Sequence, residues 1–531
     1  MAETHIKYKI WEPLLLSLVT VIGMIAGANF VETDQDHSKS QTSITNANYS
    51  GRQVEEIIRF LETKYVGEVN SDELVEKAIK AIMEGLDPHT HYFPPDQMDE
   101  LEEKSMGQYV GIGVEIIFIN DSLVVLYPKK DSPAEKAGIK PGDYILAINN
   151  QSIPNDSLTH EEIIELIKGS KGTRIKLTVK PMLQNTIRTI DIVRDEIKVP
   201  SVLAAYMIDS TVAFIKLSRF TNITYREFMD AWEKMYTEQG ARDLILDLRD
   251  NPGGYLREAV NILSQIFKEE GKLLVYTEGK NHDRTEYKST GKVFFPIENI
   301  TVVINENSAS ASEIIAGCIQ DQDRGIIVGA RSYGKGLVQE QYDLSNGGIL
   351  RLTISKYYTP SGRLIQKAYD ESSIVDTVLN FKTSTGRIVH AGGGIEPDIE
   401  VADDINWRNK MVMNWNDIIS EYAIRYNLFK YEGTTITSNN FGDIESSLPD
   451  QTSMLKELSL LAKKRLPAEA DAMIDYLNEN PNKMLRIVRA MMVAYRTGEE
   501  GWYRSFNEKD PVIIKARKVV KKNVLTAIHE G

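Results

Sequence analysis

The clearest indication of the fold is an apolar strand that runs straight into a glycine turn, DLILDLRDNPGG at residues 243–254. The run from Asp243 to Leu248 is short and rich in leucine and isoleucine, as in a buried strand. The turn at 251–254 is Asn-Pro-Gly-Gly, and the residues from Tyr255 to Phe267 have helical periodicity. Such a turn is either an ordinary tight connection or a set of exposed backbone N–H groups suited to an oxyanion.

Strands and helices alternate outward from this stretch. Further short apolar runs lie at 211–217, 301–304 and 325–328, with helical stretches at 225–236 and 312–320. This alternation predicts an α/β layered core between residues 197 and 400. A strand over 347–358 follows, and the pattern is helical again beyond about 405.

A second notable segment is NENSASASE at residues 305–313, which also joins a strand to a helix. Ser308, Ser310 and Ser312 alternate with small residues, which leaves room for a substrate carbonyl. A serine at a helix amino terminus lies at the positive end of the helix dipole. The segment is either a helix cap or a nucleophile loop, and spacing alone does not separate the three serines.

The third segment sets Lys335 between Gly334 and Gly336, with Gln339 four residues beyond the lysine. Burial disfavours the ammonium form and lowers a lysine pKa from its reference of about 10.4. A neutral amine can then take the proton of a serine hydroxyl.

The same segment fits two other motifs incompletely. Gly329 to Lys335 matches G-x-x-x-x-G-K, but the following Gly336 replaces the Ser or Thr of a phosphate-binding loop. Ser332 to Lys335 matches S-x-x-K, but its K-T-G and S-D-N partners are missing from the sequence. The core histidines, His282 and His390, have no catalytic-looking setting, so a Ser-His-Asp triad is poorly supported.

Residues 106–196 have the turns and strands of a small β-rich domain and resemble a PDZ domain. The matching pieces are Ser132-Pro133-Ala134, Ala137-Gly138-Ile139, Pro141-Gly142-Asp143 and the strand 145–149. Gly111-Ile112-Gly113-Val114 matches the carboxylate-binding loop. Its two glycines free backbone N–H groups for a terminal carboxylate, and the next strand offers an edge for β-augmentation. The alternative is a small sandwich that binds nothing.

Taken in order along residues 55–400, these segments closely resemble the carboxyl-terminal processing (tail-specific) serine protease family. The resemblance rests on Leu86-Asp87-Pro88-His89, the PDZ domain, 251–254, 308–313, Gly334-Lys335-Gly336-x-x-Gln339, and 393–398. It implies Ser310 as the nucleophile, Lys335 as the general base and Gln339 as the group that orients the lysine.

The resemblance also implies an oxyanion hole made of the backbone N–H groups of Ala311 and Gly254 (or Gly253). Some members of the family are described with an acid at the position of Asp321. Eleven helical residues separate Asp321 from Ser310, roughly 16 Å along the axis. A direct relay through Asp321 would therefore require a break in the helix, and Gln339 ranks above it.

The expected fold is a multidomain α+β chain with a crotonase-like α/β protease core. Its expected parts are a signal anchor or signal peptide at 1–31, a flexible linker at 32–50, an N-terminal helical region at 51–105, the PDZ domain at 106–196, the serine protease core at 197–404 and a helical C-terminal extension at 405–531.

The amino terminus indicates export. Lys7 and Lys9 precede an apolar run from Leu14 to Phe30, which as a helix reaches about 26 Å. Lysines ahead of such a run place it with its start in the cytoplasm. We expect an anchor in the inner membrane, or a signal peptide cleaved near Ala26 to Ala28, and an extracytoplasmic location that is periplasmic in a Gram-negative bacterium.

The composition argues against several classes of ligand and cross-link. A net charge of −14 argues against nucleic acid. The single cysteine, Cys318, excludes an intrachain disulfide and a cysteine-based zinc site. We expect no metal or organic cofactor, because acyl transfer by a serine and a lysine needs neither. The His89–His91 pair also lacks the further ligands that would close a metal site.

The predicted function is cleavage of exported proteins near their carboxyl termini. The expected substrates end in unstructured apolar tails that the PDZ domain captures. Further partners would be the membrane, a second copy of the chain or an adaptor. The alternative is a catalytically inactive, PDZ-based peptide-binding scaffold.

Overall fold

The computed structural model describes residues 50–98, 107–119, 122–153, 158–182, 184–368, 379–402, 405, 407–431 and 441–522. The chain divides into two compact units, residues 1–78 and 79–531. The expected signal segment at 1–31 lies outside the described residues. Within the described ranges, no helix is long and apolar enough to cross a membrane.

The first unit is helical in its described part. It contains α2 (Ser50–Lys64) and the start of α3 (Ser71–Glu84). Helix α2 is amphipathic, and Ile57 and Phe60 on it are 58% and 54% exposed. In α3, Lys77 pairs with Glu73 one turn earlier at 2.6 Å.

The central sheet of the second unit has the strand order β10-β11-β12-β15-β16-β21. The strands from β11 onward are parallel, and β10 is antiparallel to β11. Every residue of β11, β12 and β15 is buried, as expected for parallel strands covered on both faces. The strands are β10 (Val202–Met207), β11 (Val212–Leu217), β12 (Asp243–Asp247), β15 (Ile300–Ile304), β16 (Ile326–Gly329) and β21 (Ile399–Glu400).

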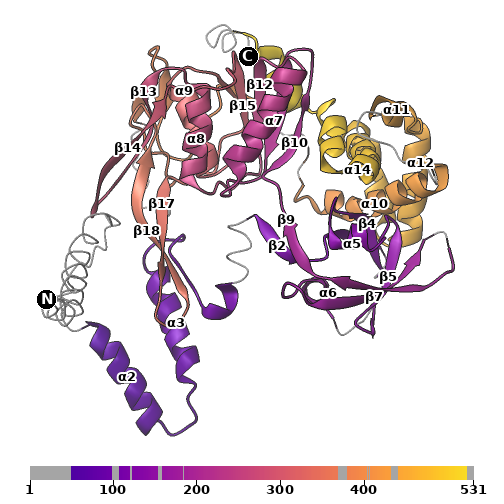
Figure 1. Ribbon diagram of the computed structural model, residues 1–531, viewed down its shortest axis with the longest axis horizontal. Coiled ribbons are helices and arrows are strands. Elements are labelled where there is room, and N and C mark those ends of the chain that lie inside the picture. The colour runs from indigo at the N-terminus through magenta and orange to yellow at the C-terminus, as the bar shows by residue number, and fades with distance from the viewer. Residues whose placement is uncertain are drawn as a thin grey trace, which may run out of the picture. The chain divides into compact units, whose positions relative to one another are not determined.

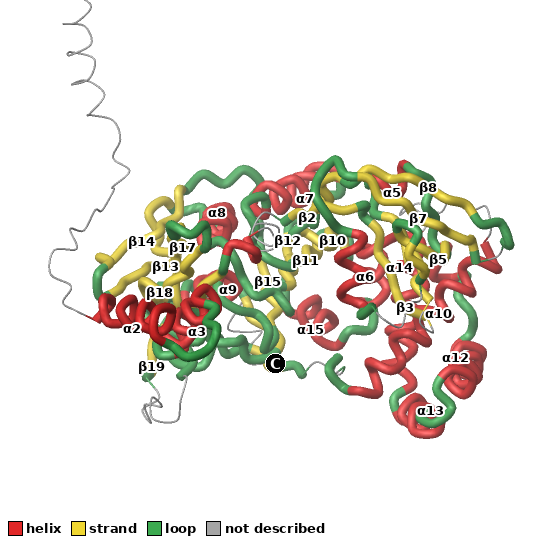
Figure 2. Tube along the Cα trace, turned by 90° about the horizontal axis from the view of Figure 1, so that it is seen from below, coloured by secondary structure: helices red, strands yellow, loops and turns green. Residues whose placement is uncertain are grey.

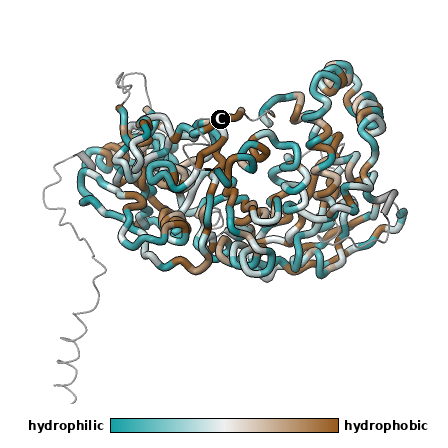
Figure 3. The backbone as a smooth tube through the Cα atoms, turned by 90° about the horizontal axis from the view of Figure 1, so that it is seen from above, coloured by the Kyte–Doolittle hydropathy of each residue, from teal (hydrophilic) through white to brown (hydrophobic). Residues whose placement is uncertain are grey.

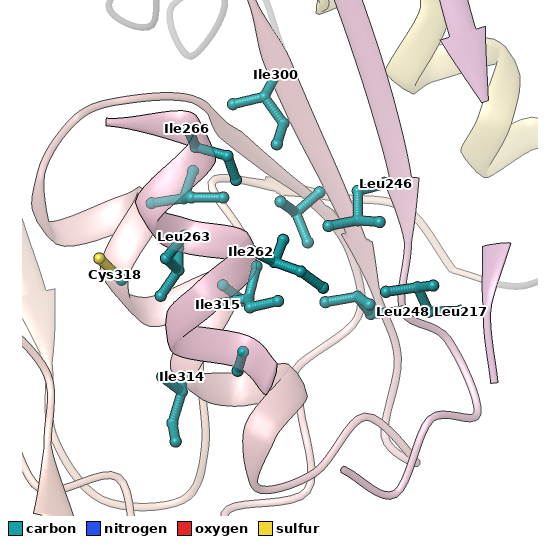
Figure 4. Packing of buried hydrophobic residues seen from close by; sticks show 14 of the residues in the cluster. Leu217, Leu246, Leu248, Ile262, Leu263, Ile266, Ile300, Ile314, Ile315 and Cys318 are labelled. Atoms are coloured by element: carbon teal, nitrogen blue, oxygen red, sulfur yellow. The ribbon is translucent and has the colours of Figure 1, made fainter. Parts of the chain in front are cut away.

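Two different regions of the chain cover the two faces of this sheet (Figure 1). Ala213, Ile215 and Leu217 join the apolar cluster of α7 (Thr224–Glu238), α8 (Leu256–Ile266) and α9 (Ala311–Asp321). Figure 4 shows Leu217, Leu246 and Leu248 facing the side chains of α8 and α9. The alternate residues Val212 and Phe214 join the cluster of α15 (Pro511–Val519). The C-terminal extension therefore supplies one layer of the core.

A second sheet beside the core holds β17, which carries Gln339. Its order is β1-β18-β13-β14, with β17 paired to β18. The strands are β1 (His91–Phe93), β13 (Glu270–Gly279), β14 (His282–Thr290), β17 (Leu337–Asp343) and β18 (Ile349–Tyr358). Residues 91–93, which the sequence placed in a helical region, thus join the core by pairing with β18. A small hairpin pairs β19 (Asn380–Lys382) with β20 (Ile388–His390), and η2 (Pro95–Gln97) follows β1.

The predicted PDZ region folds around a sheet of order β3-β4-β5-β7-β8 with its own apolar core. Its first strand, β3, pairs with β4 on one side, and no described strand pairs with its other edge. The elements are β2 (Gln108–Gly111), β3 (Val114–Ile119), β4 (Ser122–Pro128), α5 (Pro133–Lys136), β5 (Asp143–Ile148), β6 (Gln151–Ser152), α6 (His160–Ile167), β7 (Arg174–Pro181), β8 (Arg188–Val193) and β9 (Asp195–Lys198). Strands β2 and β9 form a separate ribbon.

The helices before α15 form a domain with a separate apolar core. They are α10 (Lys410–Tyr431), α11 (Phe441–Ser446), α12 (Gln451–Arg465), α13 (Ala470–Glu479) and α14 (Pro481–Asn507). Brown and teal segments alternate along them in Figure 3, as expected of amphipathic helices. Ile424 and Tyr495 pack against Val124 and Leu126 of β4, where α10 and α14 lie beside the PDZ region (Figure 2).

Candidate active site

Ser310 lies at a strained turn where the loop after β15 enters α9. Its backbone has φ 54° and ψ −112°, a conformation that a residue with a Cβ rarely adopts. The Ser310 N–H donates to Glu313 Oε2 at 2.8 Å, which holds the turn closed. A strained strand-to-helix turn of this kind presents a serine side chain away from the backbone.

The two neighbouring serines are fully buried, and the hydroxyl group of each donates a hydrogen bond to a backbone carbonyl. Ser308 Oγ donates to Leu248 O at 2.8 Å, and Ser312 Oγ donates to Asn251 O at 3.0 Å. Ser310 is partly exposed. The structure therefore separates the three serines that spacing alone left open, and leaves Ser310 as the accessible one.

Two backbone N–H groups beside Ser310 have no hydrogen-bond partner among the described residues, those of Gly254 and Ala311. The Ala311 N–H is free because it is the first of the helix. The Gly253 N–H, by contrast, donates to Asn251 Oδ1 at 2.9 Å. Gly253 is required for packing: a Cβ there would lie 2.7 Å from Ser310 Cβ. Of the two glycines considered, Gly254 is the one free to bind an oxyanion.

Lys335 is oriented by a chain of two hydrogen bonds. Its Nζ donates to Gln339 Oε1 at 2.9 Å, and Gln339 Nε2 donates to the carbonyl of His89. Burial and the positive charge of Arg351 lower the pKa of the Lys335 ammonium. Within the described residues no hydrogen bond joins Lys335 Nζ to Ser310 Oγ, a contact that often tightens only with substrate bound.

The carbonyl of His89 is fixed by the loop at 86–89, which served in the sequence analysis only as one motif of the family resemblance. Asp87 accepts from the His89 N–H at 2.8 Å and from Thr90 Oγ1 at 2.7 Å. It also accepts from Thr353 Oγ1 of β18 at 3.2 Å. The loop therefore determines which way the Gln339 amide points.

One buried carboxylate, that of Glu313, connects the serine loop to the lysine loop. It accepts from the N–H groups of Ser310, Gly334 and Lys335 and from Ser332 Oγ, at 2.8, 2.7, 2.9 and 2.5 Å. Burial raises the pKa of Glu313 to about 7, although these hydrogen bonds oppose the shift. From the sequence alone, Glu313 was placed in the segment 305–313 and was assigned no role of its own.

Tyr357 of β18 makes a second link between the same loops. Its buried hydroxyl lies 2.6 Å from Lys335 O and 3.1 Å from Ser310 O. Nothing in the spacing of the sequence could have indicated this residue, because it lies on a strand far along the chain.

The other residues of the core that were considered for catalysis are held in contacts that stabilise the fold. Asp321 lies at the other end of α9 from Ser310 and forms a fully buried ion pair with Arg363, N to O 2.6 Å. Ser332 Oγ, the serine of the S-x-x-K match, is bound to Glu313 and to the Ile395 N–H at 2.6 Å. Cys318 is buried in α9, and burial raises the pKa of its thiol.

The predicted carboxylate loop opens onto a groove. Gly113, with φ +74°, and Val114 line a cavity of about 360 Å³ between β3 and α6. Ile112 is buried, and its carbonyl accepts from the Ala134 N–H at 2.9 Å. Gly111 ends β2 immediately before this loop.

These features define the class of a serine peptidase that carries a peptide-binding domain. Peptidase family S41 matches residues 211–401, and the PDZ domain model matches residues 124–181. The chain belongs to peptidase family S41, in agreement with the predicted resemblance to carboxyl-terminal processing proteases.

Among curated relatives, a probable CtpA-like serine protease of Staphylococcus epidermidis is 33% identical over 372 residues, covering 68% of this chain and 72% of that protein. A carboxy-terminal-processing protease of Bartonella bacilliformis is 34% identical over 315 residues, covering 59% and 71%. Among solved structures, a photosystem II D1 C-terminal processing protease has a TM-score of 0.37 and 24% identity, covering 67% of this chain and 94% of that chain.

Proposed function

We propose that the chain is an exported endopeptidase that cleaves proteins near their carboxyl termini with a Ser310–Lys335 pair. The observation that carries the proposal is the exposure of Ser310 on a strained turn whose backbone is bound, through Glu313, to that of Lys335. Nucleophile and base thus belong to one hydrogen-bonded unit.

In the proposed reaction the neutral Lys335 amine takes the proton of Ser310 Oγ as the oxygen attacks a peptide carbonyl. The N–H groups of Gly254 and Ala311 stabilise the resulting oxyanion. The lysine ammonium returns its proton to the leaving amine, and water then hydrolyses the acyl-enzyme with Lys335 again as base. Gln339 positions the amine, and Asp321 takes no part.

The groove between β3 and α6 would bind the substrate tail as an added strand, with Ile164 and Ile167 contacting its apolar side chains. The apolar run at 14–30 would hold the enzyme to the outer side of the inner membrane. We also propose that the core has crotonase-like α/β layers and that the domains have the boundaries predicted from the sequence.

The test is a cleavage assay on residues 32–531 with an unstructured protein that ends in apolar residues. Ser310→Ala and Lys335→Ala should each abolish cleavage without loss of folding. Lys382→Ala removes an exposed lysine from the β19 hairpin and serves as the control that keeps activity. Cleavage that survives Ser310→Ala would contradict the choice of nucleophile.

The inactive scaffold is the other candidate. It would be favoured if the parent protein bound tail peptides in the PDZ groove and cleaved none of them.

A further inference from the structure

The groove of the PDZ region is not built by that region alone. Its lining comes from β2, β3 and α6, and in addition from Val199 and Arg219 of the adjoining core. Arg219 lies two residues after Leu217, where the central-sheet strand β11 ends. A residue of the protease core therefore forms part of the wall of the peptide-binding site.

Arg219 is a cation in the lining of this groove whose side chain is not used in another interaction among the described residues. Its side chain is half-buried, and it forms no ion pair or side-chain hydrogen bond with any described residue. Lys168, also in the lining, pairs with Glu165 at 3.3 Å. Arg194, nearby, donates to the carbonyls of Ile167 and Leu166 at 3.1 and 2.8 Å.

A cation in the groove lining would stabilise a carboxylate bound by the backbone N–H groups of the loop at Gly113. Helix α6 ends at Ile167, so the negative end of its dipole faces this position. Arg194 offsets the last carbonyls of the helix, but its N–H groups are used in doing so. A guanidinium that is still free can offer a carboxylate two parallel hydrogen bonds.

The backbone that carries Arg219 is held in place. The next residue, Phe220, donates its N–H to Gly253 O and accepts from the Tyr255 N–H, both at 2.9 Å. These bonds fix the segment against the Asn-Pro-Gly-Gly turn, so the guanidinium is attached to a rigid support rather than to a loose loop. A rigid support reduces the entropy lost when a ligand is bound.

We propose that Arg219 binds the terminal carboxylate of the substrate and that the tail-binding site is therefore shared between the PDZ region and the protease core. The identity of the ligand as a substrate tail rests on the proposed function. The groove then distinguishes a free carboxyl terminus from an internal extended segment, because only the former carries a carboxylate beside Arg219.

The test measures binding rather than cleavage, using the full chain with Ser310→Ala. The probes are a fluorescent peptide with an apolar, free carboxyl terminus and the same peptide amidated at that end. Amidation should weaken binding to this protein about tenfold, the loss expected for one charge-assisted contact. Arg219→Gln should weaken binding of the free acid about tenfold and leave the amide unchanged.

Arg226→Gln, which removes an exposed arginine on α7, is the matched control and should bind both peptides like the parent. Arg219→Lys keeps the charge and should retain part of the preference, which guards against a folding defect. Equal losses for acid and amide, or no loss, in Arg219→Gln would overturn the proposal. If the unmutated enzyme cleaves nothing, the proposed function fails while the acid-to-amide ratio still decides the role of Arg219.

Discussion

Glu313 joins the two loops of the candidate active site, since its two oxygens accept four hydrogen bonds from them. In Glu313→Gln one oxygen becomes an NH₂ group that faces the N–H groups of Ser310 and Lys335, donor against donor. We expect kcat/KM to fall about a hundredfold, because a misplacement of the reacting groups by about 1 Å is enough to cause such a loss. Kinetics against an unstructured substrate would measure this, and full activity in the variant would contradict it.

The raised pKa of Glu313 also predicts how the free energy of unfolding depends on pH. Because burial raises the pKa of Glu313 to about 7, the folded protein holds this proton more tightly than the unfolded chain, whose value is 4.5. The free energy of unfolding should therefore decrease as pH rises from about 4.5 to about 7 through this group. Urea titrations at several pH values should show that component in the parent and lack it in Glu313→Gln. An identical pH slope in the two proteins would argue against the shift.

Gln339 is predicted to act through Lys335. Its carbonyl oxygen accepts from the ammonium at 2.9 Å, an interaction that favours the charged form of the lysine. Gln339→Ala should lower kcat roughly ten- to a hundredfold with little change in KM, since the amine loses its orientation. The acid limb of kcat/KM, which rises as Lys335 loses its proton, should move to lower pH.

Gln341→Ala is the matched control, two residues further on β17 and exposed. An unmoved acid limb in Gln339→Ala would mean that Gln339 does not act on the lysine.

Among the helices and strands, the sequence predicted those that have a clear local pattern of apolar residues or turn residues. Apolar runs identified β11, β12, β15 and β16, and turn residues marked β3 and β5 of the PDZ region, because burial and turn geometry leave a local pattern. Strands β14 and β17 were missed because their residues are mostly polar and exposed, and their stability comes from pairing with distant strands.

The sequence also predicted the candidate site in part. Ser310, Lys335 and Gln339 were reached through a family resemblance. The contacts of Glu313, Tyr357 and Asp87 were not, because each joins residues that only the folded chain brings together.

A buried ion pair connects the C-terminal extension to the strand end beside the Asn-Pro-Gly-Gly turn at 251–254. Arg249 Nη1 lies 2.8 Å from Asp510 Oδ2, and Arg249 also pairs with Asp247 at 2.7 Å. Both carboxylates are almost wholly buried, and Asp510 also caps α15 through the N–H groups of Val512 and Ile513. The extension is thus bonded to the segment that leads to Gly254.

Asp510→Ala should therefore cost about 3 kcal/mol of unfolding free energy, since it leaves Arg249 partly uncompensated in a buried position. It should also lower kcat more than it raises KM, because Arg249 supports the turn that positions Gly254. Denaturant unfolding and kinetics would measure both effects. Asp471→Ala, at the exposed first turn of α13, is the control. A variant as stable as this control would contradict the structural role of the pair.

At the scale of the whole second unit, the extension is part of the protease fold and not an appendage to it. Helix α15 buries Val512, Ile513 and Val519 against the central sheet. Each such side chain contributes about 1.5–3 kcal/mol, and a domain is stable by only about 5–15 kcal/mol in all. Any role of this region in assembly would then come in addition to completing the core.

A chain that ends at Glu508 lacks α15 and should lose most of its stability, because Phe214, Val303 and Val328 on the uncovered face of the sheet would meet water. We expect a melting temperature lowered by more than 10 °C or an insoluble product, together with loss of cleavage. A chain that ends at Lys522 keeps α15 and is the control. Thermal unfolding, with light scattering to follow oligomer size, distinguishes the two roles. A chain ending at Glu508 that melts like the control but changes its oligomeric state would show that α15 serves assembly and not the core.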